Sequence, residues 1–265
     1  MKEKEASATT ANRRNFLKGA GMTGLGLAGA AMIGSGFSTK AEAATAVSDL
    51  DILNFALNLE YLEAEFYAMS TYGANLVKLG VISAADESGP TTGGALVKGF
   101  GDWATMATAL RVDEIDHVKY LRAALGSRAV KKPAINLNAL GYGFASLASW
   151  LKLARQFEDV GVSAYLGAAP LITSKTYLGA AGAILCTEAQ HSGAVRRACY
   201  SMGVASPAVD SHDVPPSAQH PFDVDSNALS IPRTTSQVLN IVYGGGRCAG
   251  GFYPNGMNGT IVCQG

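Results

Sequence analysis

The stretch ILCTEAQHSGAVRRA, residues 184–198, places Glu188 and His191 three residues apart among good helix formers. On a helix this spacing stacks two side chains on one face. The same face takes Ile184 and Val195, so the pattern predicts that both polar side chains point inward. A buried carboxylate beside a buried imidazole must be paired, neutralised or bound to a ligand. What the rest of the chain places opposite them therefore decides the fold and its chemistry.

A second Glu-x-x-His pair lies earlier in the chain, at Glu114 and His117. Two other segments carry a single glutamate in their apolar stripe, Glu60 and Glu158, and in both a tyrosine follows seven residues later. The chain thus contains two copies of one unit, Glu-x6-Tyr followed by Glu-x-x-His. This repetition predicts two similar helix pairs.

Apolar residues at helical spacing predict four long helices, separated by connections rich in Gly, Pro, Ser and Thr. The expected ranges are about 49–70, 102–125, 146–167 and 174–202, with Ser48 or Asp49 as the cap of the first helix. Because all four inner stripes contain a glutamate, the helices are expected to bury these carboxylates together. The predicted fold class is all-α, a four-helix bundle spanning residues 44–203.

The composition changes after the fourth helix. Residues 204–265 are first rich in Pro, Ser and Asp and then in Gly and aromatic residues. This segment has too little apolar periodicity to form a core of its own. It is expected to be an irregular C-terminal extension packed on the bundle.

Four carboxylates converging in a bundle core would repel one another and could not all stay ionised. Two divalent cations would cancel their charge, and two imidazoles would complete the coordination. Oxygen and imidazole ligands suit iron or manganese. The lone glutamates are expected to bridge the two metals, and each Glu-x-x-His to give one metal a carboxylate and a nitrogen. The predicted ligands are Glu60, Glu114, His117, Glu158, Glu188 and His191.

This pattern resembles the ferritin-like di-metal carboxylate superfamily, which includes rubrerythrins, bacterioferritins and manganese catalases. The stretches PRTTSQVLNIVYGGG and GGFYPNGMNGTI in the extension are similar to exported ferritin-like proteins related to plant desiccation proteins. The resemblance covers about Ile52 to Ile261. It implies a ferritin-like bundle that carries the six ligands above.

Several neighbouring residues allow more than one interpretation. Glu63 could be a ligand or a second carboxylate near the site, and Glu60 is preferred because its spacing to tyrosine matches that of Glu158. Tyr67 and Tyr165 could hydrogen-bond the ligands, act as redox-active neighbours or be plain core aromatics.

Other polar residues are expected to lie outside the site. Asp113, Asp116 and Asp159 flank predicted ligands in sequence and are interpreted as surface charges on other helix faces. His212 and His220 lie in the Pro-rich part of the extension and are expected to be solvated.

The first 43 residues have the layout of a twin-arginine signal peptide. Paired Arg13 and Arg14 precede a Gly-rich, weakly apolar run that ends at an Ala-x-Ala site, Ala41 to Ala43. The many glycines make a retained membrane anchor the less favoured alternative. We therefore expect passage through the twin-arginine export machinery, cleavage after Ala43 without a stable membrane anchor, and a periplasmic or extracellular location.

Four cysteines in an exported chain suggest a disulfide. Cys186 and Cys199 lie on one predicted helix, roughly 20 Å apart, and cannot pair with each other. A bridge between Cys248 and Cys263 is favoured, and crossed pairings with the helix cysteines are the alternative.

Charge and motifs narrow the function. The chain has 21 basic and 21 acidic residues and no basic stripe, so nucleic acid is not an expected partner. An oxidoreductase acting on peroxide, oxygen or Fe(II) in stress protection is the first hypothesis. A non-enzymatic desiccation or stress protein with a structural or vestigial metal site is the alternative, and a storage cage ranks last. The state of assembly stays open, a homo-oligomer included.

Overall fold

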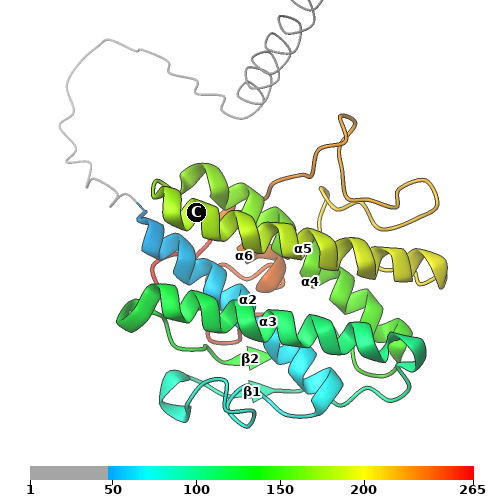
Figure 1. Ribbon diagram of the computed structural model, residues 1–265, viewed down its shortest axis with the longest axis horizontal. Coiled ribbons are helices and arrows are strands. Elements are labelled where there is room, and N and C mark those ends of the chain that lie inside the picture. Colours follow the sequence, from blue (N-terminus) through cyan, green and yellow to red (C-terminus); the bar gives the residue numbers. More distant parts are fainter. Residues whose placement is uncertain (1–46) are drawn as a thin grey trace, which may run out of the picture. The chain divides into compact units, whose positions relative to one another are not determined.

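The structure, a computed structural model, describes residues 47–265. Four long helices dominate it, as Figure 1 shows, and the predicted all-α class is confirmed. They are α2 (Asp49–Tyr72), α3 (Ala104–Leu125), α4 (Leu147–Ala168) and α5 (Lys175–Ser201). The shorter elements are α6 (Thr235–Val242), η1 (Ala84–Asp86), η2 (Gly101–Trp103), η3 (Gly126–Arg128), η4 (Ala169–Leu171), β1 (Thr91–Thr92) and β2 (Ile135–Asn136). The predicted signal peptide lies outside the described residues.

Serine side chains fix where three of the long helices begin. Ser48 caps α2 in a capping box with Asp51, Ser146 caps α4 and Ser174 caps α5. Gly73 ends α2 in the left-handed conformation that glycine adopts without strain. These local signals explain why the helix ends lie within a few residues of those predicted from the sequence.

The long helices form two antiparallel pairs. Asn54 near the start of α2 donates to the carbonyl of Arg128 just beyond α3, and Cys199 near the end of α5 donates to the carbonyl of Leu151 near the start of α4. α2 packs along α3, α4 packs along α5, and the pairs meet through α2 and α4. α3 and α5 approach each other much less closely (Figure 1).

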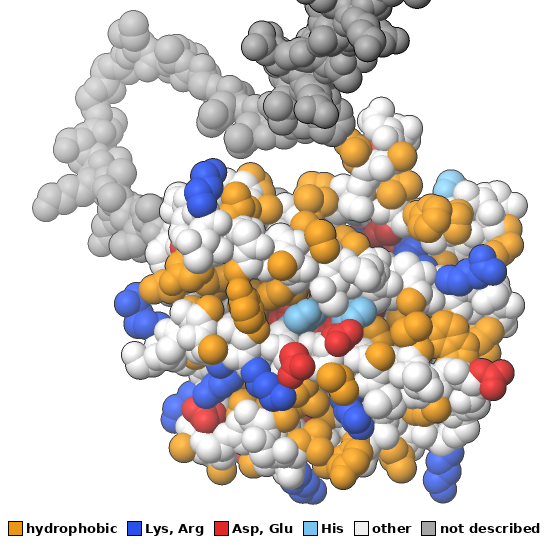
Figure 2. Space-filling view, in the orientation of Figure 1, with side chains coloured by type: hydrophobic (Ala, Val, Ile, Leu, Met, Phe, Trp, Pro, Cys, Tyr) orange, Lys and Arg blue, Asp and Glu red, His pale blue; other side chains and the backbone are white. Residues whose placement is uncertain are grey.

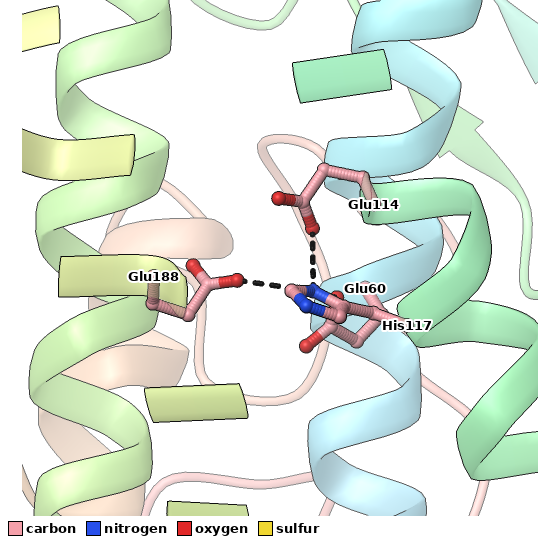
Figure 3. Close-up of side chains that lie close together, drawn as sticks. All are labelled: Glu60, Glu114, His117 and Glu188. Atoms are coloured by element: carbon pink, nitrogen blue, oxygen red, sulfur yellow. Dashed lines mark hydrogen bonds and ion pairs between the residues drawn. The ribbon is translucent and has the colours of Figure 1, made fainter. Parts of the chain in front are cut away.

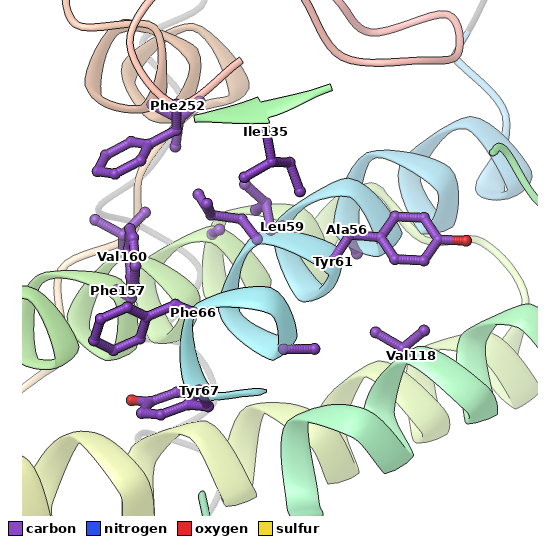
Figure 4. Close-up of a cluster of buried hydrophobic side chains, with 14 of the residues drawn as sticks. Ala56, Leu59, Tyr61, Phe66, Tyr67, Val118, Ile135, Phe157, Val160 and Phe252 are labelled. Carbon is purple, nitrogen blue, oxygen red and sulfur yellow. The ribbon is translucent and has the colours of Figure 1, made fainter. Parts of the chain in front are cut away.

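Aromatic side chains fill the core between α2 and α4. The rings of Phe66 and Phe157 lie 5.2 Å apart, and Phe157 lies 5.1 Å from Phe252 of the C-terminal extension. Ile135 of β2 joins the same cluster (Figure 4). The extension therefore contributes to the bundle's own hydrophobic core.

Hydrogen bonds also hold the extension against α2. Tyr253 Oη donates to the Asn58 carbonyl at 2.7 Å, and the side chain of Asn58 is bonded to the backbone of Asn258. The favoured disulfide, between Cys248 and Cys263, is present, whereas Cys186 and Cys199 carry no disulfide. The extension was predicted to be irregular, but it contains α6, a short helix with a capping box at Thr234.

Buried ion pairs join α4 to α5, join α4 to residues 204–233, and link residues within that segment. Asp159, predicted to be a surface charge, is only 2% exposed. Its carboxylate accepts from Arg196 Nη1 at 2.6 Å, and Arg155 binds Asp213 at 2.6 Å. Arg233 likewise binds Asp210 at 2.8 Å. The prediction for Asp159 was wrong because its arginine partners come from other turns and other elements, which helical periodicity along one segment cannot show.

No helix among residues 47–265 combines the length and apolarity needed to cross a membrane.

Asp223 lies beside this network, and its Oδ1 has no hydrogen-bond partner among the described residues. Burial and the nearby Asp159 raise the pKa of Asp223 from 3.8 to about 6. The folded protein therefore binds this proton more tightly than the unfolded chain, and the group lowers stability as pH rises through that interval. We expect Asp223→Asn to raise the free energy of unfolding at neutral pH, and to leave it unchanged in acid, in urea titrations at several pH values.

Asp225→Asn serves as the control in the same segment. Backbone hydrogen bonds from Leu229 and Asn227 lower the pKa of Asp225, so this group stabilises the folded state above its ordinary pKa. The control should therefore be less stable than wild type at neutral pH. Equal effects of the two substitutions would contradict the assignment.

Candidate metal centre

The six predicted ligands lie together in the middle of the bundle. α2 and α4 each contribute one glutamate, while α3 and α5 each contribute a glutamate and a histidine one turn apart. None is more than 9% exposed: Glu60, Glu114, His117, Glu158, Glu188 and His191. Figure 3 shows that four of them, from α2, α3 and α5, point toward one another.

The six side chains form two overlapping groups in which the potential ligand atoms lie within 4.8 Å of one another. The first group contains Glu60 and His117, and the second contains Glu158 and His191. Glu114 and Glu188 belong to both. In this geometry the glutamates of the Glu-x-x-His pairs are the ones common to both groups, whereas the sequence analysis expected the lone glutamates to be shared.

Helix direction explains this reversal. α3 and α5 run antiparallel, so the step of three residues from glutamate to histidine goes in opposite directions along the bundle. The two glutamates consequently belong to both groups, while each histidine belongs to one. Each lone glutamate lies level with one histidine, as the 3.2 Å distance from Glu60 Oε2 to His117 Nδ1 shows.

Each histidine turns Nδ1 toward the carboxylates. His117 Nδ1 lies 3.2 Å from Glu114 Oε2 and 3.2 Å from Glu188 Oε1, contacts drawn in Figure 3. His191 Nδ1 lies 2.8 Å from Glu114 Oε1 and 3.5 Å from Glu158 Oε2. Both imidazoles therefore offer the same nitrogen to the site.

Seven inward-facing atoms make no hydrogen bond of good geometry among the described residues, although several of them lie within ion-pair distance of each other or of His117 Nδ1. They are Glu60 Oε2, Glu63 Oε2, Glu114 Oε1, Glu158 Oε2, both carboxylate oxygens of Glu188, and His191 Nδ1. Buried polar atoms are rarely left in this condition, because an unpaired carboxylate in a dry core is costly. Oxygen and imidazole donors gathered in two overlapping groups fit a pair of divalent transition-metal ions.

The electrostatics of the side chains show the same need for positive charge. Burial and then the neighbouring Glu114 raise the pKa of Glu188 well above its usual range, and burial raises the pKa of Glu114 to about 7. For Glu60, the nearby imidazole of His117 outweighs burial and lowers the pKa. Burial opposes protonation of His191, yet its carboxylate neighbours raise its pKa to about 12. Without a cation, protons must hold these groups together.

Two tyrosines hold the lone glutamates in place. Tyr67 Oη donates to Glu158 Oε1, and Tyr165 Oη donates to Glu60 Oε1. In both glutamates the other oxygen, Oε2, is the one that faces the site and its histidines. Burial, followed by the adjacent carboxylates, raises the pKa of both tyrosines well above the usual range, so they remain neutral donors. Of the roles left open by the sequence, the geometry shows hydrogen bonding to the ligands.

Asp113 contacts His191, which the sequence did not reveal. Its Oδ2 lies 3.0 Å from His191 Nε2, the nitrogen on the outer side of the ring. A carboxylate in this position fixes the imidazole so that Nδ1 is free to bind a metal. Asp113 precedes Glu114 in sequence but meets a histidine from another helix, so only the packing of α3 beside α5 could show the pair.

The histidine side of the site lies close to solvent. His117 is 9% exposed and His191 is 7% exposed, while the side chain of Asp113 is 48% exposed. Figure 2 shows two histidine side chains beside acidic side chains near the middle of the face between α3 and α5. The remaining histidines, His212 and His220, are exposed residues of the extension, as predicted.

A bundle of four long helices with overlapping buried clusters of glutamate and histidine defines a ferritin-like helical protein with a potential di-metal site. The sequence model of the family described as Ferritin-like domain matches residues 48–201, more than half of the 265-residue chain. The chain therefore belongs to the ferritin-like domain family. A comparison with curated proteins gave no match.

We expect Asp113→Ala to lower metal affinity by about 10- to 100-fold, because loss of a partner that orients a ligating histidine typically has an effect of that size. Titration of the metal-free protein with Mn(II) or Fe(II), the latter under anaerobic conditions, would measure the change. Asp116→Ala is the matched control, since Asp116 is exposed and paired with Lys119 on the same helix. Equal losses in the two variants would show that only the surface charge matters.

Proposed function

We propose that this protein is an exported di-metal oxidoreductase that binds two iron or manganese ions and acts on peroxide, dioxygen or Fe(II) in stress protection. The observation that carries the proposal is the pair of overlapping groups, joined through Glu114 and Glu188, in which five carboxylate oxygens make no hydrogen bond of good geometry. Four helices contribute six buried carboxylate and imidazole side chains to one place, whereas a structural ion pair needs only two side chains.

The donor atoms support iron or manganese. Glu60, Glu114, Glu158 and Glu188 would supply oxygen ligands, and His117 and His191 would supply nitrogen ligands, a set that suits these metals. A bound pair of such ions would supply Lewis acidity and reversible electron transfer at two adjacent centres.

The chain's own residues set the conditions for this chemistry. Tyr67 and Tyr165 hold the lone glutamates so that one oxygen of each points inward. The two histidines are each less than a tenth exposed, so little of the site faces solvent between α3 and α5. Peroxide, dioxygen and a single metal ion are small enough to suit a site with so little exposed surface, whereas bulky organic substrates are not.

Asp113 offers a connection for protons. It is half exposed and contacts His191 Nε2, so one carboxylate touches both solvent and a ligand of the proposed metal pair. Reduction of peroxide or dioxygen consumes protons, and a carboxylate at this position can carry them toward the site.

We also propose that the chain is exported through the twin-arginine machinery to the periplasm or beyond. The support is the paired Arg13 and Arg14 ahead of an apolar run and an Ala-x-Ala site. The disulfide between Cys248 and Cys263 agrees with an oxidising compartment.

A second candidate is a non-enzymatic stress or desiccation protein. Its support is that α3 and α5 approach each other less closely than the other neighbouring helices do. Ions bound by ligands from both helices would join them, which is a structural role. Similarity of the extension to desiccation-related proteins points in the same direction.

Metal analysis of the protein purified from its native compartment tests the site. We expect about two iron or manganese ions per chain. Glu114→Ala should lose both ions because Glu114 belongs to both groups, whereas Glu60→Ala should weaken mainly the ion near His117. Retention of two ions by Glu114→Ala, with a folded circular-dichroism spectrum, would refute a shared role for Glu114.

Activity assays on the metal-loaded protein separate the two candidates. We expect consumption of hydrogen peroxide, or oxidation of added Fe(II), at a rate that Glu114→Ala reduces to that of free metal in buffer. Inactivity in both assays, together with a metal-dependent rise in the unfolding temperature, would favour the structural candidate instead.

A further inference from the structure

Glu63 is a buried carboxylate that belongs to neither group of potential ligands. It lies one turn beyond Glu60 on α2 and is only 5% exposed. Its Oε2 has no hydrogen-bond partner among the described residues. Glu65, the third buried glutamate of α2 after Glu60 and Glu63, lies 3.8 Å from Lys132 Nζ and beside the Leu76 amide. Glu63 is therefore the buried carboxylate of this helix that the fold does not account for.

The internal repeat shows what is unusual about this position. Glu60 and Tyr67 on α2 correspond to Glu158 and Tyr165 on α4, so Glu63 corresponds to Gly161. Each lies three residues after the lone glutamate and four before the tyrosine. One half of the repeat thus has a carboxylate where the other half has no side chain.

The missing side chain makes room for Glu63. A Cβ atom added to Gly161 would lie 2.5 Å from Glu188 Oε2 and 3.2 Å from Glu63 Oε1. Both oxygens therefore reach the space beside Gly161, and any side chain there would displace them. Because α2 and α4 run antiparallel, this space lies between the levels of Glu60 and Glu158, where the two groups of ligands overlap.

The neighbours of Glu63 are negative rather than positive. Burial, followed by the charges of Glu188, Glu114 and Glu158, raises the pKa of Glu63 well above its usual range. A carboxyl group placed solely for packing would be replaced at less cost by an apolar or amide side chain. A cation shared with Glu188 gives this carboxylate a partner.

We propose that Glu63 is a seventh metal-binding side chain, which adds a carboxylate from the α2–α4 side of the pair in the space left by Gly161. The inference rests on the proposed function, since it needs a metal pair to bind. A seventh ligand would give the two ions different coordination. The reason is that α4 has no carboxylate at the position that corresponds to Glu63.

The test compares Glu63→Gln with Glu65→Gln, the same substitution at the buried glutamate of α2 that lies outside the proposed site. Metal-free and metal-loaded forms of each variant are followed by Mn(II) titration and by thermal unfolding. We expect Glu63→Gln to unfold at a higher temperature than wild type when metal-free, because an unpaired buried carboxyl is removed. Its affinity for one of the two ions should fall at least about tenfold, since even residues that only support ligands affect affinity to this extent. Glu65→Gln should bind both ions as wild type does.

A second pair of variants probes the same space from α4. Gly161→Ala places a methyl group against Glu63 and Glu188, and we expect it to lower the affinity for metal. Gly193→Ala on α5, where an added Cβ meets nothing within 4 Å, is the control. If wild type and Glu63→Gln bind two ions with equal affinity, the role of Glu63 is refuted while the proposed function stands. Wild-type protein that binds no pair of ions would overturn the proposed function together with it.

Discussion

The structure depends on how the bundle accommodates five carboxylates at its centre. Each of the glutamates is at most 5% exposed, and only two histidines face them. Such a concentration of acid cannot stay ionised in a dry core without positive charge. The shifted pKa values of Glu114 and Glu188 express that requirement, and so does the number of carboxylate oxygens without partners. A pair of divalent cations supplies this positive charge with fewer charged groups than any arrangement of side-chain ion pairs.

The positions of these groups follow from helix direction more than from sequence spacing. A step of three residues moves a side chain one turn along its helix, and on antiparallel helices the same step leads opposite ways. The Glu-x-x-His pairs of α3 and α5 therefore place their glutamates at the centre. The same rule lets Tyr67 of α2 reach Glu158 of α4, and Tyr165 of α4 reach Glu60. The internal repeat thus produces a site whose halves are related but not identical.

Much of the fold could be predicted from the sequence because its signals are local. Apolar spacing and serine caps gave helix ranges that agree with α2, α3, α4 and α5 to within a few residues. The six inward side chains were recognisable because two copies of one unusual spacing occur in inner stripes. Features that depend on contacts between helices were missed or misread: the sharing of Glu114 and Glu188, the contact of Asp113 with His191, and the burial of Asp159. The short helix α6 was missed because eight residues carry too weak a periodicity within a Gly-rich segment.

The two sides of the site differ in a way that bears on its chemistry. On the α2–α4 side, Phe157 packs against both Phe66 and Phe252. Tyr253 of the extension is hydrogen-bonded to the Asn58 carbonyl. Aromatic and aliphatic side chains thus fill that side of the site. On the α3–α5 side the helices are further apart, and His117 and His191 are 9% and 7% exposed. Small molecules that entered past the histidines would not compete for space with a carboxylate on the opposite side. An extra acidic ligand could thus change the charge of the metal pair without obstructing the approach to it, and this is the arrangement that α2 and α4 create.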